Sequence, residues 1–179
     1  FAYADEDAAL TDALRLSRGM TYKSALAGLP MGGGKAVIIG DPRTQKTPAL
    51  LRAMGRFVDS LNGLYITAED SGTSVADIKL IGETTAHVSG VVATDKFGGD
   101  PSPYTALGTF AGIKAAVAHR LNSDSLDGVR VAIQGVGSVG YYLAELLVAD
   151  GAHVIAADVN QANLDRVTQL GTQVEIVDP

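Results

Sequence analysis

A lysine at the end of a glycine run is a candidate for acid–base chemistry. Lys35 follows three consecutive glycines at positions 32–34, inside the otherwise apolar segment 30–39. Such surroundings leave a lysine partly desolvated, and desolvation lowers its pKa towards the range in which an amine acts as a base. Lys23 lies twelve residues earlier, and a second cation nearby further disfavours the charged form of Lys35. The two lysines therefore predict a base with a lowered pKa.

Two other interpretations apply to this lysine. A lysine taken singly is most often a solvated surface residue, and this alternative stays open. A phosphate-binding loop of the GxxxxGK[ST] type requires glycine at position 29 and serine or threonine at position 36. The chain has Leu29 and Ala36 there, and the predicted strand follows the lysine instead of preceding it, so this loop is excluded.

An acid lies where a partner for the lysine is expected. Asp70 follows the short apolar segment 65–67 and precedes Gly72. Its carboxylate is suited to stabilising positive charge and passing protons, and the alternative is an N-cap for a helix predicted over residues 74–83. The histidines have no ligand spacing, so we predict no metal site; they are His87, His119 and His153.

The strongest motif is the glycine pattern GVGSVG at residues 135–140. It closes a predicted strand and opens a predicted helix, as a dinucleotide-binding turn does. Gly135 permits the tight turn, Gly137 lets the backbone approach a pyrophosphate, and Gly140 allows the helix to pack closely on the strand. The free N–H groups of the helix N-terminus then face the phosphates. The alternative is a structural crossover without a ligand.

A carboxylate at the end of the next strand indicates which dinucleotide binds. Asp158 follows Gly140 by 18 residues and is suited to accept hydrogen bonds from both ribose hydroxyls. It would repel a 2′-phosphate, and no arginine or lysine adjoins it. The motif therefore predicts NAD in preference to NADP.

Hydrophobic periodicity predicts the elements that position these residues. Helices are expected over residues 5–18, 48–61 (with Thr47 as N-cap), 74–83, 103–121, 138–150 and 161–170. Strands are expected over residues 36–39, 65–67, 129–134, 152–158 and 173–177. The alternation after residue 129 predicts βαβ units with a parallel sheet, and the aperiodic segment 90–103 predicts a linker between domains.

Composition excludes several classes of protein. Of 179 residues 14 are basic and 20 acidic, and the net charge of −6 argues against non-specific binding to nucleic acid or anionic membranes. The longest uncharged run, residues 131–144, is too short to span a bilayer. The absence of cysteine excludes disulfides and thiolate catalysis. The chain begins at Phe1 and ends after a predicted strand, from which we expect both ends to be cut.

Five stretches together resemble the amino-acid dehydrogenases of the glutamate, leucine, phenylalanine and valine group, nearest to the leucine and valine branch. They are residues 15–23, 30–38, 65–70, 102–108 and 134–140. The resemblance implies an α/β protein in which an α/β substrate-binding domain precedes a Rossmann-type dinucleotide-binding domain, both incomplete in this chain. The first would be a substrate-binding and oligomerisation domain over residues 1–90, and the second an NAD-binding domain over residues 91–179.

The resemblance also implies roles for individual residues. Lys35 and Asp70 would be catalytic, Lys23 would bind the substrate carboxylate, and the small Ala68 would leave room for an aliphatic substrate side chain. Thr105 would lie near the nicotinamide carboxamide. The remaining cofactor contacts would come from Gly135, Gly137, Ser138, Val139, Gly140, Asp158 and Val159.

The implied activity is NAD-dependent, reversible oxidative deamination of an aliphatic L-amino acid to a 2-oxo acid, ammonia and NADH. The enzyme would be a cytoplasmic homo-oligomer with a small-molecule substrate and no nucleic-acid or membrane partner. Two alternatives stay open. In the first, the chain is a non-catalytic dinucleotide-binding module. In the second, it performs the same chemistry on phenylalanine or glutamate.

Overall fold

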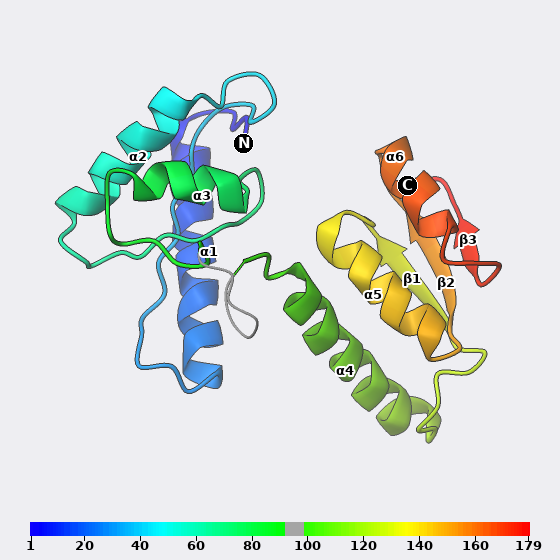
Figure 1. Cartoon of the computed structure of the whole chain (residues 1–179). Coiled ribbons are helices and arrows are strands. Elements are labelled where there is room, and N and C mark those ends of the chain that lie inside the picture. The colour runs from blue at the N-terminus through cyan, green and yellow to red at the C-terminus, as the bar shows by residue number, and fades with distance from the viewer. Residues whose placement is uncertain (92–98) are drawn as a thin grey trace. The chain divides into compact units, whose positions relative to one another are not determined.

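The computed structural model describes residues 1–91 and 99–179, which belong to two compact units, Phe1–Asp100 and Pro101–Pro179 (Figure 1). The first contains α1 (Glu6–Leu26), α2 (Pro48–Ser60) and α3 (Val75–Gly82). The second contains α4 (Ser102–Leu121), β1 (Arg130–Gln134), α5 (Ser138–Ala149), β2 (His153–Ala157), α6 (Gln161–Thr168) and β3 (Val174–Ile176). The units therefore divide inside the segment predicted as a linker, whereas a functional domain boundary after residue 90 stays a prediction.

Helix α1 is longer than the sequence predicts. Its N-terminus is capped by Asp5, as the acidic start suggests, but it continues beyond Arg18 to Leu26. The prediction ended before Gly19, and a single glycine inside a helix costs only about 1 kcal/mol relative to alanine, which a long helix tolerates. The extension matters for the site, because it places Lys23 in the last turn of α1.

Helices α2 and α3 pack on each other through a small apolar core. Leu51 of α2 and Ile78 and Ile81 of α3 are almost completely buried in it. Thr47 caps α2 and its hydroxyl accepts a hydrogen bond from the Leu50 amide, as predicted. The core fixes the start of α3, and with it the loop that carries Asp70.

The two strands predicted in the first unit are wrong for the described residues. The segment 36–39 forms no ladder; its hydrogen bonds include one from the Phe1 amino group to the Ile38 carbonyl, at 2.9 Å. The segment 65–67 contributes one parallel bridge, between Thr67 and Val88. Apolar, β-branched residues favour extended backbone, but a strand also requires a neighbouring strand to satisfy its backbone groups.

The second unit is built on a parallel sheet with the strand order β1–β2–β3. Helices α5 and α6 connect successive strands and contact the sheet and each other, so both lie on one face of it, while α4 packs against α5. The buried core includes Val136, Leu147, Val154 and Val167. This confirms the predicted βαβ succession and the α/β class.

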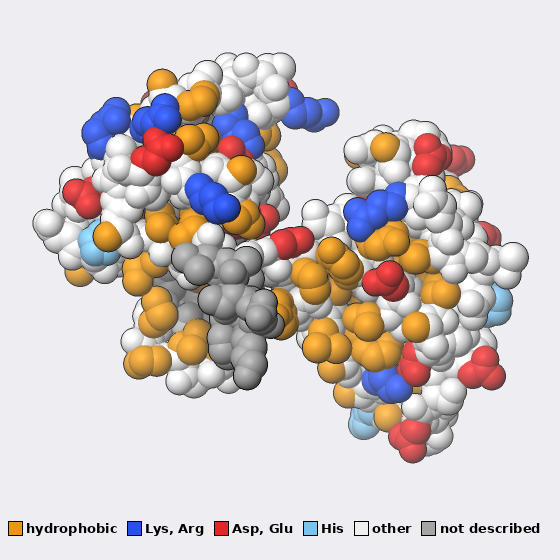
Figure 2. Space-filling model, viewed as in Figure 1, with side chains coloured by type: hydrophobic (Ala, Val, Ile, Leu, Met, Phe, Trp, Pro, Cys, Tyr) orange, Lys and Arg blue, Asp and Glu red, His pale blue; other side chains and the backbone are white. Residues whose placement is uncertain are grey.

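Both units expose apolar side chains. Figure 2 shows hydrophobic side chains gathered over α4 and α5 of the second unit, where Tyr104 and Leu107 are exposed. In the first unit α1 exposes Leu10, Leu14 and Tyr22. None of the helices in the described part of the chain is long and apolar enough to cross a membrane.

Candidate active site

The glycine run lies directly on helix α1, which positions the lysine that follows it. A methyl group at Gly33 would overlap the backbone amide of Thr21 and the backbone carbonyl of Ser17, both in α1. At Gly34 it would come within 2.8 Å of the Tyr65 ring. Only residues without a Cβ allow so close an approach of the backbone. The loop is therefore held between a helix and an aromatic ring.

Lys35 and Asp70 form an ion pair between Nζ and Oδ2. The Lys35 side chain is only 24% exposed. Burial lowers the pKa of Lys35, and the charge of Lys23 lowers it further. Asp70 acts in the opposite direction because a carboxylate stabilises an ammonium group, yet the net direction is downward, in agreement with the sequence-based expectation.

Asp70 opens a tight turn and does not cap α3. Its backbone carbonyl accepts hydrogen bonds from the Thr73 amide and the Thr73 hydroxyl, both at 2.8 Å. The N-cap of α3 is Ser74, whose hydroxyl accepts a hydrogen bond from the first turn of the helix. The interpretation of Asp70 as the helix cap is therefore wrong, and its carboxylate is available to Lys35.

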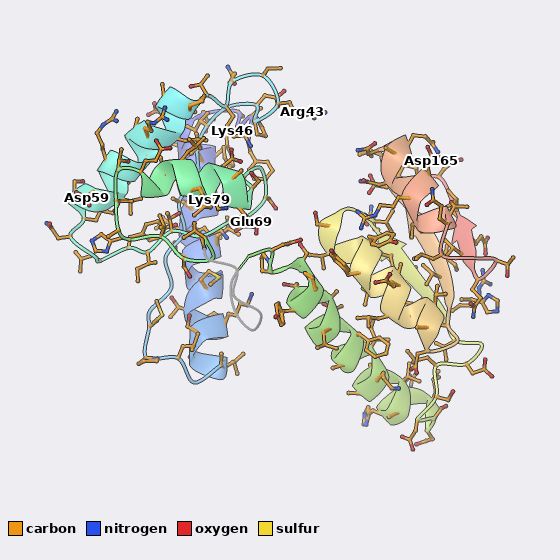
Figure 3. The ribbon with its side chains drawn as sticks, in the orientation of Figure 1. Arg43, Lys46, Asp59, Glu69, Lys79 and Asp165 are labelled. Carbon is orange, nitrogen blue, oxygen red and sulfur yellow. The ribbon has the colours of Figure 1, made fainter. Side chains whose placement is uncertain are left out.

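The segment before Asp70 is held by its backbone. The Thr67 amide donates to the His87 carbonyl at 3.0 Å, and the Ser89 amide donates to the Thr67 carbonyl at 2.8 Å. Ala68, the predicted substrate-pocket residue, follows this bridge and is exposed. Glu69 lies on the same loop leading into α3 (Figure 3), and burial and the charge of Asp100 raise its pKa.

In the second unit the glycine motif has the geometry expected of a dinucleotide-binding turn. Gly135 has a φ of +90°, which favours glycine, and a methyl group at Gly140 would overlap the Gly135 carbonyl. Gly137 is the N-cap of α5, and no side chain caps this helix. Apart from its chain neighbours, the only atom of residues 1–91 and 99–179 within 4 Å of a methyl group built at Gly137 is Nδ2 of Asn163, at 3.9 Å. An uncapped helix N-terminus beside open space suits a phosphate group.

Asp158 ties the end of β2 to this turn. Its Oδ2 accepts hydrogen bonds from the Val136 amide at 2.9 Å and from Asn163 Nδ2 at 3.0 Å, and its Oδ1 accepts one from the Asn160 amide at 2.8 Å. The bonds from Asn160, Asn163 and Val136 together outweigh burial and lower the pKa of Asp158. The carboxylate is therefore ionised at neutral pH, with acceptor capacity left for a ligand.

The other predicted cofactor contacts are distributed around the same unit. Ser138 and Val139 begin α5 within the glycine motif, and Val159 is 93% exposed directly after Asp158. The Thr105 hydroxyl lies in the first turn of α4 and donates to the Pro101 carbonyl at 3.1 Å. Its proton is thus engaged, so this hydroxyl oxygen would serve a ligand as an acceptor.

The structure brings the predicted residues into two sets, one in each unit. In the first unit Lys35 is paired with Asp70 and is influenced by the charge of Lys23, and in the second the glycine motif and Asp158 contact each other. Among residues 1–91 and 99–179 no group of three or more histidine and acidic side chains is arranged to hold a metal ion.

Sequence reasoning missed several residues that hold these sets in place. Asn160 and Asn163 hold Asp158, and Tyr65 packs on the glycine run. The capping box of Ser74 and Asp77 has a recognisable local pattern, S-x-x-D before an apolar run, and could have been found. The bonds from Asn160 and Asn163 to Asp158 are also local, two and five residues apart, whereas no local spacing connects Tyr65 with the glycine run.

Comparisons with known proteins identify the family of the chain. Residues 3–87 match the family model described as Glu/Leu/Phe/Val dehydrogenase, dimerisation domain, and residues 100–166 match the model described as glutamate/leucine/phenylalanine/valine dehydrogenase. The chain belongs to the Glu/Leu/Phe/Val dehydrogenase family. Members of this family use NAD(P).

Individual relatives of this dehydrogenase-family chain differ in substrate. It is 53% identical to the leucine dehydrogenase of Thermoactinomyces intermedius over 94% of this chain and 46% of the relative. It is 46% identical to the valine dehydrogenase of Streptomyces virginiae, over 99% of this chain and 49% of the relative. The crystal structure of L-tryptophan dehydrogenase from Nostoc punctiforme matches all of this chain and 49% of that one, with a TM-score of 0.65 and 46% identity. The chain thus spans about half the length of the relatives it matches.

Proposed function

We propose that the protein is an NAD-dependent L-amino-acid dehydrogenase that oxidatively deaminates an aliphatic substrate of the leucine or valine type. One observation carries the proposal: a partly buried lysine with a lowered pKa, Lys35, is paired with Asp70 and lies within the electrostatic reach of Lys23. A module that only binds a dinucleotide has no use for this arrangement. The family membership and the relatives named above support the same chemistry.

Each charged residue has a task that its surroundings suit. Lys23 is exposed at the end of α1, and its ammonium group would pair with the substrate α-carboxylate. Neutral Lys35 would take a proton from the amino group and later from the water that hydrolyses the imine. The Asp70 carboxylate would stabilise the positive charge that builds up on the substrate nitrogen and pass protons to and from Lys35.

The second unit fits the dinucleotide that this reaction requires. The close contact with the Gly135 carbonyl leaves no room for a side chain at position 140. The N-terminus of α5 has no side-chain cap and offers its backbone amides to a pyrophosphate. Asp158 would accept hydrogen bonds from the ribose hydroxyls, and Thr105 one from the carboxamide. When bound, NAD accepts the hydride that leaves the substrate α-carbon.

The complete protein that contains this chain is expected to form NADH from L-leucine, L-valine or L-isoleucine faster than from L-phenylalanine or L-glutamate. The leucine and valine dehydrogenases among the relatives support this order, and the small Ala68, two residues before Asp70, leaves room for an aliphatic substrate side chain. The measurement is NADH absorbance with each amino acid in turn, with a reaction lacking amino acid as control. If none of the five supports NADH formation, the proposed function is wrong.

NAD is expected to be strongly preferred over NADP, because the ionised Asp158 would repel a 2′-phosphate. Asp158→Ala should lower the ratio of kcat/KM with NAD to kcat/KM with NADP by about tenfold or more. Asp158→Asn is the control for folding, since its amide oxygen keeps part of the hydrogen bonding to the glycine turn while the charge is lost. Steady-state kinetics with both cofactors test this. Equal turnover with NAD and NADP in the unmodified protein would contradict the assignment.

The assembly we propose is a homo-oligomer formed through the first unit. The family model that covers residues 3–87 is described as a dimerisation domain. Helix α1 also exposes large apolar side chains that a second copy would cover, Leu10, Leu14, Tyr22 and Leu26.

A further inference from the structure

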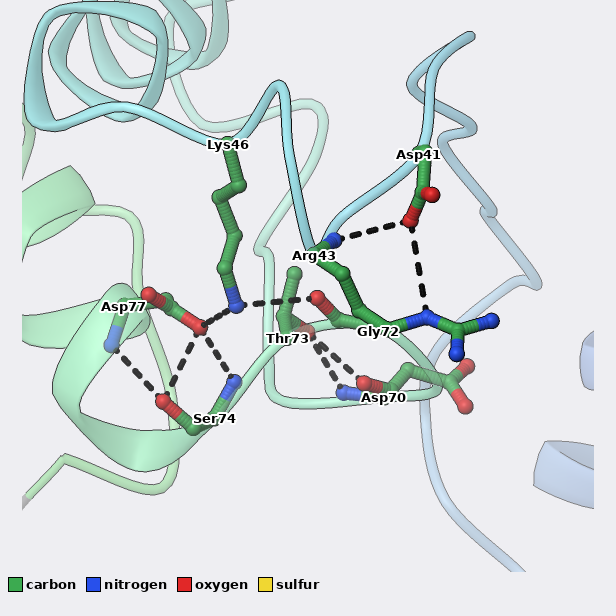
Figure 4. A network of polar contacts seen from close by, with 8 residues as sticks. All are labelled: Asp41, Arg43, Lys46, Asp70, Gly72, Thr73, Ser74 and Asp77. Atoms are coloured by element: carbon green, nitrogen blue, oxygen red, sulfur yellow. Dashed lines mark hydrogen bonds and ion pairs between the residues drawn. The ribbon is translucent and has the colours of Figure 1, made fainter. Parts of the chain in front are cut away.

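A lysine outside the proposed catalytic set reaches across to the loop of Asp70. Lys46 lies in the loop before α2, and its Nζ is 2.6 Å from Asp77 Oδ2 and 3.2 Å from the Gly72 carbonyl oxygen (Figure 4). Gly72 is part of the turn that Asp70 opens. One ammonium group therefore joins this turn to the first turn of α3.

The turn itself is closed by few contacts. Thr73 donates its amide and its hydroxyl to the Asp70 carbonyl, and the Asp70 amide donates to the Thr73 hydroxyl at 3.0 Å. Gly72 between them has a φ of +82°, in the left-handed region. Such a turn has no apolar core of its own, so its position depends on what holds its ends. The end towards α3 is held by Lys46.

The other partner of Lys46 is a nearly buried carboxylate. The Asp77 side chain is 12% exposed, and its Oδ2 also accepts hydrogen bonds from the Ser74 amide and hydroxyl, at 2.8 and 2.9 Å. Burial raises the pKa of Asp77, but the hydrogen bonds from Lys46 and Ser74 outweigh it and the pKa is lowered. The carboxylate is thus an ionised anchor that fixes the ammonium group.

We infer that Lys46, anchored by Asp77, is a positioning residue that holds the Asp70 turn so that the Asp70 carboxylate meets Lys35. The inference rests on the proposed dehydrogenase function. Lys46 touches neither Lys35 nor Asp70 among the contacts described, and acts through the Gly72 carbonyl. Without it, Asp70 would sample positions away from Lys35, and catalysis depends steeply on such alignment.

The chain offers a matched control. Arg52 of α2 and Glu83 at the other end of α3 form an ion pair of 2.7 Å, and the two residues are 31 positions apart, as are Lys46 and Asp77. Both pairs link the region of α2 to α3. Only the Lys46 pair reaches the Asp70 turn. Arg52→Met therefore removes an ion pair of similar length, although a more exposed one, without releasing that turn.

The test compares Lys46→Met, Lys46→Gln, Lys46→Arg and Arg52→Met in the complete protein. Lys46→Met should lower kcat by about tenfold with KM for NAD unchanged, and Lys46→Arg should restore most of the activity. Arg52→Met should keep the unmodified kcat. Thermal unfolding of each variant shows whether it is folded, and Lys46→Gln, which keeps a donor for Asp77, replaces Lys46→Met if the latter does not fold.

The pH profile separates positioning from a general loss of stability. Lys35 faces Asp70 and is influenced by Lys23, and loss of the carboxylate neighbour would lower its pKa further. The acid limb of the pH profile of kcat/KM should therefore move to lower pH in Lys46→Met and stay at its original pH in Arg52→Met. An unshifted limb and unmodified kcat in a folded Lys46 variant, or an equal loss in Arg52→Met, would overturn the inference. Lys35→Ala in the same assay tests the proposed function separately, because its failure to lose activity would contradict that function whatever the Lys46 variants do.

Discussion

Replacing Lys35 with alanine is expected to lower kcat for amino-acid oxidation by about 10² or more, the scale of a lost general acid–base group. The side chain is partly buried and paired with Asp70, and its pKa is lowered by burial and by Lys23, so it gives up its proton more readily than an ordinary lysine does. Binding of NAD should persist, because the dinucleotide turn belongs to the other unit. Steady-state kinetics and NADH fluorescence titration measure the two effects.

Lys23→Ala provides the contrast. Its proposed contact with the substrate carboxylate exists in the ground and transition states alike, so its loss should act mainly on KM. Removing this cation should also raise the pKa of Lys35, and since the neutral amine is the active form, the acid limb of kcat/KM should move to higher pH. A Lys35→Ala enzyme with near-normal kcat would contradict the proposed role of Lys35 as the proton-transfer group.

The second unit was predictable from the sequence because its elements are local and periodic. Each strand and helix follows from its own hydrophobic pattern, and the glycine motif marks the turn between β1 and α5. The register that pairs Gln134 with Ala157 then brings Asp158 beside the turn. Sequence did not show that Asp158 also holds the turn, since that role depends on its hydrogen bond from the Val136 amide, 22 residues away.

The first unit was less predictable because its site depends on contacts between distant segments. The run 36–39 has strand composition but no strand partner among the described residues, and composition alone cannot supply one. The glycines before Lys35 were recognised in the sequence. Only the structure shows why glycine is needed there, namely that the loop lies against Ser17 and Thr21 of α1. The Lys46–Asp77 pair, 31 residues apart, has no local signature.

Gly33→Ala is expected to lower kcat by about 10² although it removes no functional group. The added methyl group would fall on the Thr21 amide and the Ser17 carbonyl, which are backbone atoms of a helix and cannot move aside as a flexible side chain would. The loop must therefore shift away from α1, and this shift moves Lys35 out of its ion pair with Asp70. Overpacking of this kind also destabilises a fold by about 1–3 kcal/mol, which thermal unfolding would show.

Gly19→Ala is the matched control, because it adds the same methyl group to α1 at a position where no described residue, the adjoining backbone of α1 aside, has an atom within 4 Å. It should leave kcat unchanged and, by improving helix propensity, stabilise the protein by up to about 1 kcal/mol. KM for NAD should be unaffected in both variants, since neither alters the second unit. If Gly33→Ala keeps full kcat, the close packing of the glycine run on α1 does not position Lys35. If instead kcat falls and KM for NAD rises together, the substitution has disturbed more than the lysine loop.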